Sequence, residues 1–220
     1  MTAVVQEASF RITEIFHSLQ GEARTVGMPT VFVRLTGCPL RCVYCDTEYA
    51  FSGGEMMSIA QILEVVRGYD CPRVCVTGGE PLAQPGCKTL LQVLCDAGFA
   101  VSLETSGAMP IAETDTRVSR VLDLKTPDSG ESHRNLWENI PHLTDNDQVK
   151  FVVCSRADYE WARFKLDEYG LAGRVSDVLL SPSFGVVNPT ELAEWLLADK
   201  LPARLQLQLH KLLWNDEPGH

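Results

Sequence analysis

The chain has 220 residues, of which 45% are hydrophobic and 22% are charged, so its composition excludes an intrinsically disordered protein. Its formal net charge of -10 at pH 7 argues against a nucleic-acid or anionic-membrane partner, because such surfaces require clustered Lys and Arg. The N-terminal segment lacks a signal-peptide pattern, and no apolar run has the length of a membrane span. We therefore expect a cytoplasmic protein with a small-molecule ligand.

Apolar runs of strand length alternate with helical patterns along the chain. After a hairpin-like segment at 10–20, the predicted strands cover residues 30–37, 73–79, 99–107, 120–125, 148–155, 177–183 and 204–211. The predicted helices cover residues 58–69, 88–98, 156–170 and 188–200, and residues 108–116 form an irregular connection.

This alternation predicts a parallel sheet, because strands joined by right-handed crossovers run in the same direction. Runs rich in Val, Leu and Ile indicate strands that are buried on both faces. A complete eightfold barrel typically takes ~250 residues. The sequence therefore predicts an α/β fold, a partial (incomplete) parallel βα barrel of about six or seven strands, in a single domain over residues 1–220.

Polar residues collect where the predicted strands end. In parallel α/β sheets, the chemistry lies beyond the carboxyl ends of the strands. The segments at these ends are 37–38, 77–80, 104–107, 123–125, 181–183 and 210–211. We expect them to form one rim around a site.

Three cysteines, Cys38, Cys42 and Cys45, follow the first predicted buried strand. Thiolates with CxxxCxxC spacing can bind three corners of a 4Fe-4S cluster and leave the fourth iron without a protein thiolate. A non-catalytic zinc-binding module is the alternative from a different class. It needs a fourth Cys or His at suitable spacing, and the neighbouring sequence offers neither.

The other five cysteines lie within strand or helix patterns. Cys71 and Cys75 repeat the CxxxC spacing, but Cys75 lies in the apolar run VCV and the next cysteine, Cys87, is twelve residues away. Free Cys in such positions behaves as a small hydrophobic residue. We predict that Cys71, Cys75, Cys87, Cys95 and Cys154 serve only in packing.

The cysteine motif, with the aromatic residue Tyr44 before Cys45, resembles that of the radical S-adenosylmethionine superfamily. The stretch 77–80, TGGE, resembles the superfamily's glycine-rich strand end, where glycine lets the backbone approach the cofactor. The resemblance implies that S-adenosylmethionine chelates the open iron. An electron from the cluster would then break a carbon–sulfur bond and release a deoxyadenosyl radical.

Further motifs resemble the 7-carboxy-7-deazaguanine synthase family over nearly the whole chain. They are LQGE (19–22), the CDT ending of the cysteine motif (45–47), VTGGEPL (76–82), ETSG (104–107), DLKTP (123–127) and Q-x-H-K (208–211). The chain departs from the family at Ala23, where a second glycine is usual, and in the tail 215–220, which extends beyond the shorter family endings.

The resemblance implies conversion of 6-carboxy-5,6,7,8-tetrahydropterin to 7-carboxy-7-deazaguanine, with loss of ammonia, in queuosine biosynthesis. The radical would abstract hydrogen from the pterin carbon that bears the carboxylate, and the hydrogen would later return to the cofactor. The family also uses Mg2+, with the hydroxyl of Thr47 as a ligand. Mg2+ keeps few protein ligands and several waters, so one threonine suffices only when substrate is present. From the residues alone, Thr47 is a loop hydroxyl bonded to backbone.

The same resemblance implies that Leu19, Gln20, Gly21 and Thr77 contact the pterin and that Arg34 pairs with its carboxylate. From the residues alone, an Arg in an apolar strand needs an acidic partner, and a structural ion pair meets that need equally well. The residues implied to surround S-adenosylmethionine are Tyr44, Asp46, Gly79, Ser106, Asp123, Leu124, Lys125, Ser181, Pro182, Ser183 and Phe184. No side chain is assigned as catalytic, because the cofactor supplies the radical.

His210 and Lys211 are as well suited to structural hydrogen bonds as to ligand contact. A glycyl-radical enzyme activase is the nearest alternative function, since it shares the cysteine motif and the small size but acts on a protein backbone. LQGE and Arg34 favour a small carboxylated substrate instead. The family resemblance also implies a homodimer and an electron donor such as flavodoxin or ferredoxin.

Overall fold

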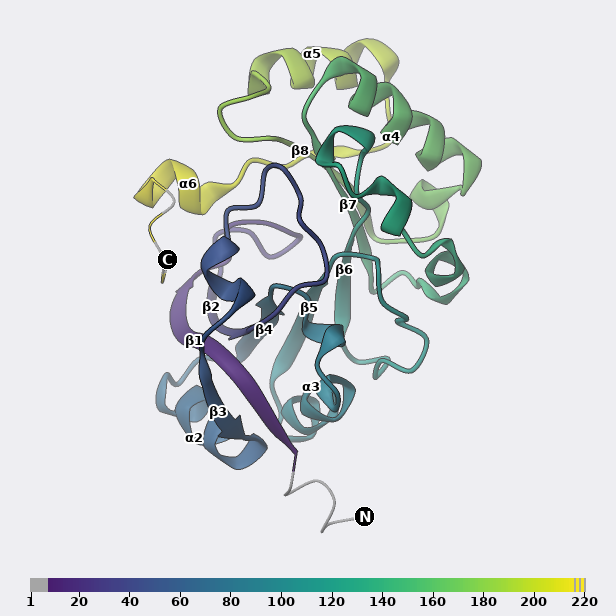
Figure 1. Ribbon diagram of the computed structural model, residues 1–220. Helices are drawn as coiled ribbons and strands as arrows, with labels where there is room; N and C mark the ends of the chain where they lie inside the picture. Colours follow the sequence, from purple (N-terminus) through teal and green to yellow (C-terminus); the bar gives the residue numbers. More distant parts are fainter. Residues whose placement is uncertain (1–7, 216, 218, 220) are drawn as a thin grey trace.

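A computed structural model of the chain describes residues 8–215, 217 and 219 (Figure 1). Its sheet has nine strands in the order β3-β1-β2-β4-β5-β6-β7-β8-β9. The strands are β1 (Ser9–Leu19), β2 (Pro29–Leu35), β3 (Glu55–Ser58), β4 (Arg73–Gly78), β5 (Ala100–Thr105), β6 (Ser119–Asp123), β7 (Gln148–Val153), β8 (Asp177–Pro182) and β9 (Arg204–Leu205).

The strands from β2 through β4 to β9 pair in parallel, which makes seven parallel strands among the described residues. β1 runs antiparallel to both β2 and β3. β3 and β9 lie at the two ends of the strand order and do not pair with each other, so the ring stays open. The predicted partial parallel barrel is confirmed.

Five α-helices accompany this sheet among the described residues. They are α2 (Ile59–Gly68), α3 (Cys87–Asp96), α4 (Arg156–Glu168), α5 (Pro189–Asp199) and α6 (Leu209–Trp214). At the helix starts, Ser58 and Gln61 form a capping box, and Ser155 and Asn188 accept hydrogen bonds from backbone N–H groups of α4 and α5. None of the helices in the described part of the chain is long and apolar enough to cross a membrane.

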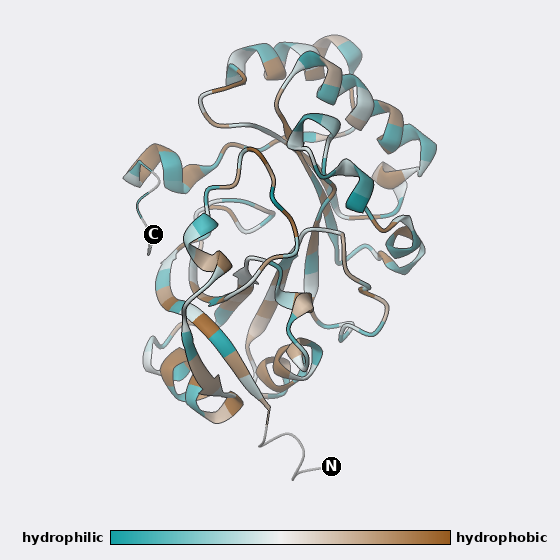
Figure 2. Ribbon diagram, viewed as in Figure 1, coloured by the Kyte–Doolittle hydropathy of each residue, from teal (hydrophilic) through white to brown (hydrophobic). Residues whose placement is uncertain are grey.

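Strand residues alternate between two environments. Val33, Val76 and Leu103 point into an apolar cluster with α2 and α3, and Phe151 and Leu180 belong to a second cluster with α4 and α5. Figures 1 and 2 show these helices along the sheet, with teal and brown residues mixed on each helix, as expected for helices with one apolar face. Because side chains alternate along a strand, every second residue points to the opposite face, which lines the barrel lumen.

Three sequence predictions about the elements were wrong. Residues 10–20 form the single long strand β1 rather than a hairpin-like segment, and its pairing partner β3 was not predicted. Residues 204–211 were predicted as a strand, but β9 ends at Leu205 and His210 and Lys211 lie on α6. After β9 the chain leaves the sheet, and the backbone N–H of Leu209 at the start of α6 donates to the carbonyl of Gly21 at 2.9 Å, which ties α6 to the β1–β2 connection.

The irregular connection predicted at 108–116 is confirmed, since no helix or strand of the described chain lies between β5 and β6. The β6–β7 connection also lacks an α-helix and contains only 3-10 turns. The side of the barrel at β5–β7 is therefore covered by loops.

Candidate active site

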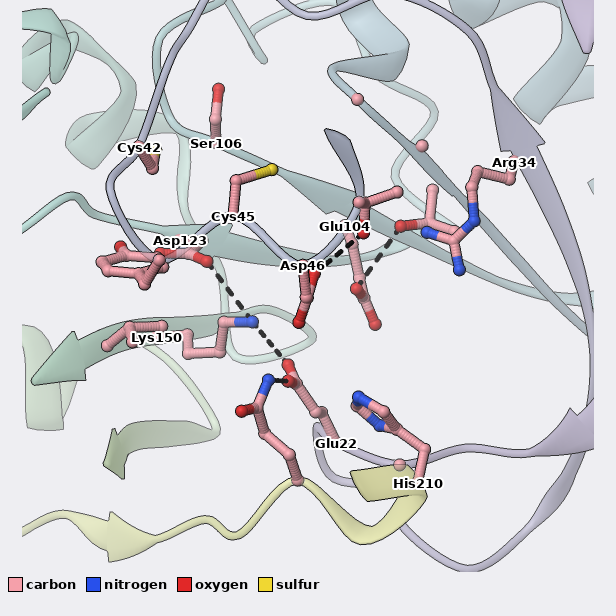
Figure 3. A pocket seen from close by; sticks show the side chains of 18 of the residues that line it. Glu22, Arg34, Cys42, Cys45, Asp46, Glu104, Ser106, Asp123, Lys150 and His210 are labelled. Carbon is pink, nitrogen blue, oxygen red and sulfur yellow. Dashed lines mark hydrogen bonds and ion pairs between the residues drawn. The ribbon is translucent and has the colours of Figure 1, made fainter. Parts of the chain in front are cut away.

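The lumen of the barrel contains a cavity of about 550 Å³, within the size range of small-molecule sites. The cysteine loop, residues 37–47, follows β2 and lies at the carboxyl ends of the parallel strands. The β1–β2 connection, residues 20–28, lies at the opposite ends, where its Arg24 backbone N–H donates to the side chain of Gln148 at the start of β7. The cysteine loop thus lines one side of the cavity, and the β1–β2 connection and α6, with Glu22 and His210, form its floor on the other side (Figure 3).

The cysteine loop is held by backbone hydrogen bonds. Gly37 N–H donates to the carbonyl of Ala50 at 2.7 Å, and Glu80 N–H donates to the carbonyl of Gly37 at 2.8 Å. Gly79 has to be glycine because a Cβ there would lie 2.2 Å from the Gly37 oxygen. The glycines after β4 therefore let this strand end pack directly against the cysteine loop.

Cys38, Cys42 and Cys45 are free thiols, half-buried, on the cavity wall. Burial raises the pKa of all three thiols, that of Cys42 to about 11, so a bound cation is needed to hold them as thiolates. Among the described residues, no three His, Cys, Asp or Glu side chains converge on a single metal-ion position. A 4Fe-4S cluster gives each thiolate its own iron, so these separated thiols fit a cluster better than mononuclear zinc.

Glu80, fully buried, joins the ends of β4 and β5. Its carboxylate accepts hydrogen bonds from the Thr105 hydroxyl at 2.9 Å, the Ser106 backbone N–H at 2.7 Å and the Ser106 hydroxyl at 2.5 Å. It also accepts from the Leu82 N–H at 2.9 Å. These bonds fix the position of Ser106 on the cavity wall.

Asp123 and Lys125 form a buried ion pair at the end of β6, with Nζ and Oδ2 3.1 Å apart. Burial opposes the charge on Asp123, but Lys125 and Lys150 outweigh it and lower its pKa. Burial likewise opposes the charge on Lys125, and Asp123 outweighs it and raises its pKa. The Lys125 ammonium lies 5.6 Å from the ring centre of Tyr44, which connects this pair to the cysteine loop.

Lys150 and Glu22 form a second buried ion pair, on the floor side of the lumen. Lys150 Nζ lies 2.5 Å from Glu22 Oε2 and 3.3 Å from Asp123 Oδ2, and Figure 3 shows all three side chains converging. The amide of Gln208 donates to the other oxygen of Glu22 at 2.7 Å. Burial opposes the charge on Glu22, but Lys150 outweighs it and lowers the pKa.

Among the carboxylates of the described cavity wall, Glu104 is the one whose pKa is raised, by burial and by the nearby charge of Glu22. It accepts weak hydrogen bonds from Gln20 at 3.3 Å and Thr77 at 3.5 Å. No lysine or arginine in the described residues forms an ion pair with it. Glu104 can therefore accept further hydrogen bonds from a ligand in the cavity.

Arg34 lies on the lumen face of β2, opposite Glu14 on β1. Its Nε donates to Glu14 Oε1 at 2.7 Å, and the Tyr49 hydroxyl donates to the same oxygen at 2.8 Å. The Arg34 guanidinium lies 5.7 Å from the ring centre of Phe16, which stacks on Phe32 at 4.9 Å. Glu14 therefore binds the guanidinium through Nε alone. The two terminal nitrogens are left to pair with a ligand carboxylate, which suits their geometry.

The helix α6 contacts both ends of the cavity. Lys211 Nζ lies 2.7 Å from Asp46 Oδ2, and the Thr47 hydroxyl donates to Asp46 Oδ1 at 2.8 Å. Burial opposes the charge on Asp46, but Lys211 outweighs it and lowers the pKa to about 2. On the floor, a Cβ at Gly21 would lie 2.1 Å from His210 Nδ1, so glycine is required there for His210 to pack.

The predicted site residues can be compared with the cavity wall. The wall includes most of them: Leu19, Gln20, Gly21, Arg34, Cys38, Cys42, Tyr44, Cys45, Asp46, Thr47, Thr77, Gly79, Ser106, Asp123, Lys125, Ser183 and Phe184. Leu124, Ser181 and Pro182 are not on this wall, and Leu124 belongs to the apolar cluster under α4 and α5. Their predicted roles stay predictions, as do those of the wall residues.

The wall residues Phe16, Phe32 and Lys150 were missed from the sequence, and Glu22, Glu104 and Gln208 were assigned no site role although they lie within its motifs. Strand alternation could have indicated Lys150, because it is a charged residue between the apolar neighbours Val149 and Phe151 of a buried strand. The partners of Glu22 lie 128 and 186 residues away in the chain, so no local pattern could have indicated them.

Comparisons with known proteins agree with this geometry. Residues 32–125 match the model of the Radical SAM superfamily. A 7-carboxy-7-deazaguanine synthase from Chlorobaculum tepidum is 45% identical over 214 residues, covering 96% of this chain and 97% of the relative. The chain belongs to the 7-carboxy-7-deazaguanine synthase family. A second member, from Koribacter versatilis, is 43% identical and covers 94% of this chain and 98% of its own length.

The solved structures agree with this membership. The crystal structure of QueE from Escherichia coli superimposes with a TM-score of 0.74 at 26% identity, covering 94% of this chain and 97% of that one. Streptococcus suis SuiB bound to S-adenosylmethionine, at 14% identity and a TM-score of 0.58, covers 82% of this chain and 51% of its own and shares the fold alone. The chain is thus a radical S-adenosylmethionine enzyme of this family along nearly its whole length.

Ala23, which departs from the family's usual glycine, adopts a left-handed backbone conformation with φ of 60°. Glycine adopts this conformation without strain, whereas a Cβ makes it unfavourable. A glycine would suit this turn without strain, and Ala23 adopts it at some cost in stability.

Proposed function

We propose that this chain converts 6-carboxy-5,6,7,8-tetrahydropterin to 7-carboxy-7-deazaguanine with loss of ammonia, a carbon–nitrogen lyase reaction whose product is the compound named in its relatives' names. The observation that carries the proposal is one cavity whose wall carries three cluster-type thiols together with the buried carboxylates of Glu22 and Glu104 and the guanidinium of Arg34. The product belongs to the 7-deazapurines, so the pathway is queuosine-type nucleoside biosynthesis.

Cys38, Cys42 and Cys45 would hold the 4Fe-4S cluster, and S-adenosylmethionine on its open iron supplies a hydrogen-abstracting radical. Asp123 and Lys125 present a carboxylate and an ammonium beside the cysteine loop, a pair that suits a zwitterionic amino acid such as this cofactor. The ring of Tyr44 and the fixed Ser106 hydroxyl add an apolar and a polar contact on the same side. These residues orient the cofactor and exclude water from it.

The pterin would bind between Arg34 and the two acids Glu22 and Glu104. A tetrahydropterin carries several N–H donors along one edge, which carboxylates accept, and its carboxylate suits the terminal nitrogens of Arg34. Leu19, Gln20 and Gly21 complete the floor, together with Thr77 on β4. The raised pKa of Glu104 falls when N–H donors approach it, because they favour the charged form.

Mg2+ is the finer part of the proposal, with the Thr47 hydroxyl as ligand. Its support is limited to the position of Thr47 on the cavity wall, where the hydroxyl now donates to Asp46. A Thr47→Ala variant should lose stimulation by Mg2+, whereas Thr47→Ser should retain it. Equal Mg2+ dependence in both variants would contradict this ligand assignment.

We further propose that residues 1–220 act as one radical S-adenosylmethionine domain, that the enzyme is a cytoplasmic homodimer, and that flavodoxin or ferredoxin supplies its electron. Support for one domain comes from the single sheet that both apolar clusters share. Support for a reducing compartment comes from eight cysteines without a disulfide. Light scattering tests the dimer, and reduction of the cluster by each protein tests the donor.

The deciding experiment is anaerobic turnover. Reconstituted protein with about four irons per chain should convert the pterin to 7-carboxy-7-deazaguanine when S-adenosylmethionine, Mg2+ and a reductant are present. Cys42→Ala should abolish conversion and lower the iron content. An intact cluster without deazaguanine product would overturn the proposal, and modification of a protein backbone instead would identify a glycyl-radical enzyme activase.

A further inference from the structure

Lys150 is a buried cation that contacts acids from both ends of the cavity. Only 9% of its side chain is exposed, and its ammonium donates to Glu22 at 2.5 Å and lies 3.3 Å from Asp123. Glu22 belongs to the floor, where Gln208 binds its second oxygen. Asp123 belongs to the cysteine-loop side, where Lys125 pairs with it at 3.1 Å. The described ion pairs thus form a chain from Lys125 through Asp123 and Lys150 to Glu22.

We propose that Lys150 is a positioning residue that orients the Glu22 and Asp123 carboxylates together and so fixes the pterin relative to S-adenosylmethionine. This inference rests on the proposed function, because it assigns Glu22 to the pterin and Asp123 to the cofactor. Lys150 acts through the two acids, so it needs no contact with either ligand. A single ammonium that bonds both acids keeps the distance between them constant.

The two acids depend on Lys150 to different extents. Asp123 would keep the full charge of Lys125 at 3.1 Å if Lys150 lost its charge, whereas Glu22 would keep the neutral amide of Gln208 and the electrostatic influence of His210. Glu22 also faces the neighbouring acid Glu104, so without Lys150 its charged form would become less favourable. Loss of the Lys150 charge should therefore weaken pterin binding more than cofactor binding.

The test compares Lys150→Met with two other variants. Lys125→Met removes a lysine that contacts only cofactor-side groups, Asp123 and Tyr44, and Lys88→Met removes a lysine paired with Glu113 at the surface. Iron content, S-adenosylmethionine affinity without pterin, and pterin KM and kcat are measured for each variant. Lys150→Met should raise the pterin KM about 10- to 100-fold and lower the affinity for S-adenosylmethionine only a few-fold. Lys125→Met should lower the affinity for S-adenosylmethionine and change the pterin KM less than about threefold. Lys88→Met should leave both quantities at their wild-type values.

A double-mutant cycle separates positioning from a general structural role. In the Glu22→Gln background, Lys150→Met should change the pterin KM by less than about threefold, because its target has lost its charge. If Lys150→Met alone folds poorly, the double variant removes both charges and keeps the comparison with Glu22→Gln possible. The proposal is overturned if Lys150→Met leaves KM within twofold of wild type, or if it acts equally strongly in the Glu22→Gln background.

The cofactor arm keeps the two proposals separate. Wild-type enzyme that binds S-adenosylmethionine but does not convert the pterin would overturn the proposed function. In that case, cofactor affinity would still test the positioning role. The role is supported if Lys150→Met lowers this affinity a few-fold in the wild-type background but lowers it no further in the Asp123→Asn background. An unchanged cofactor affinity in Lys150→Met would overturn it.

Discussion

Replacement of Glu80 by Gln should destabilise the enzyme strongly although the two side chains have the same shape. The Glu80 carboxylate is fully buried and accepts hydrogen bonds from two hydroxyls and from the backbone N–H groups of Leu82 and Ser106. An amide nitrogen in place of either oxygen faces one of these N–H donors, which cannot reverse its direction. With the charge also lost, we expect the free energy of unfolding to fall by about 2–4 kcal/mol.

Anaerobic thermal unfolding of the reconstituted protein measures this loss, which corresponds to a melting temperature lower by roughly 5–15 °C. Glu113→Gln is the matched control, because 84% of that side chain is exposed and it pairs only with Lys88 at the surface. Glu80→Gln should also weaken S-adenosylmethionine binding, since Ser106 loses its anchor. A melting temperature for Glu80→Gln equal to that of Glu113→Gln would refute the reasoning.

Two further predictions concern the floor and the pterin carboxylate. Ala23→Gly should leave the free energy of unfolding unchanged or raise it by up to about 1 kcal/mol, because it relieves the left-handed backbone, whereas Ala162→Gly inside α4 should lower it by about 1 kcal/mol or more. Chemical unfolding measures both, and equal losses would contradict the strain at Ala23. Glu14→Gln should raise the pterin KM roughly tenfold with little change in kcat, because Arg34 loses its charged anchor, and Tyr49→Phe should have less than about a threefold effect. A fall in kcat without a change in KM would show that Glu14 does not act through Arg34.

The parallel barrel and its cluster site could be predicted because both depend on local patterns. Strands such as β4 carry apolar residues at every second position, and these residues pack against the helices. The CxxxCxxC loop binds three irons with cysteines that are all close in sequence. The prediction failed where a local pattern had two solutions. The alternating stretch 204–211 satisfies strand periodicity, but only Arg204 and Leu205 pair with β8 before the chain turns into α6.

The amino-acid sequence by itself determined the strand and helix alternation, the three thiols for a cluster and the family to which the chain belongs. Only the tertiary structure decided which charged and polar side chains meet at the floor of the cavity. Lys150 meets Glu22 across 128 residues of chain, and Gln208 meets it across 186. The physical reason is that a buried charge depends on its neighbours in space, and closure of the barrel selects those neighbours from distant segments.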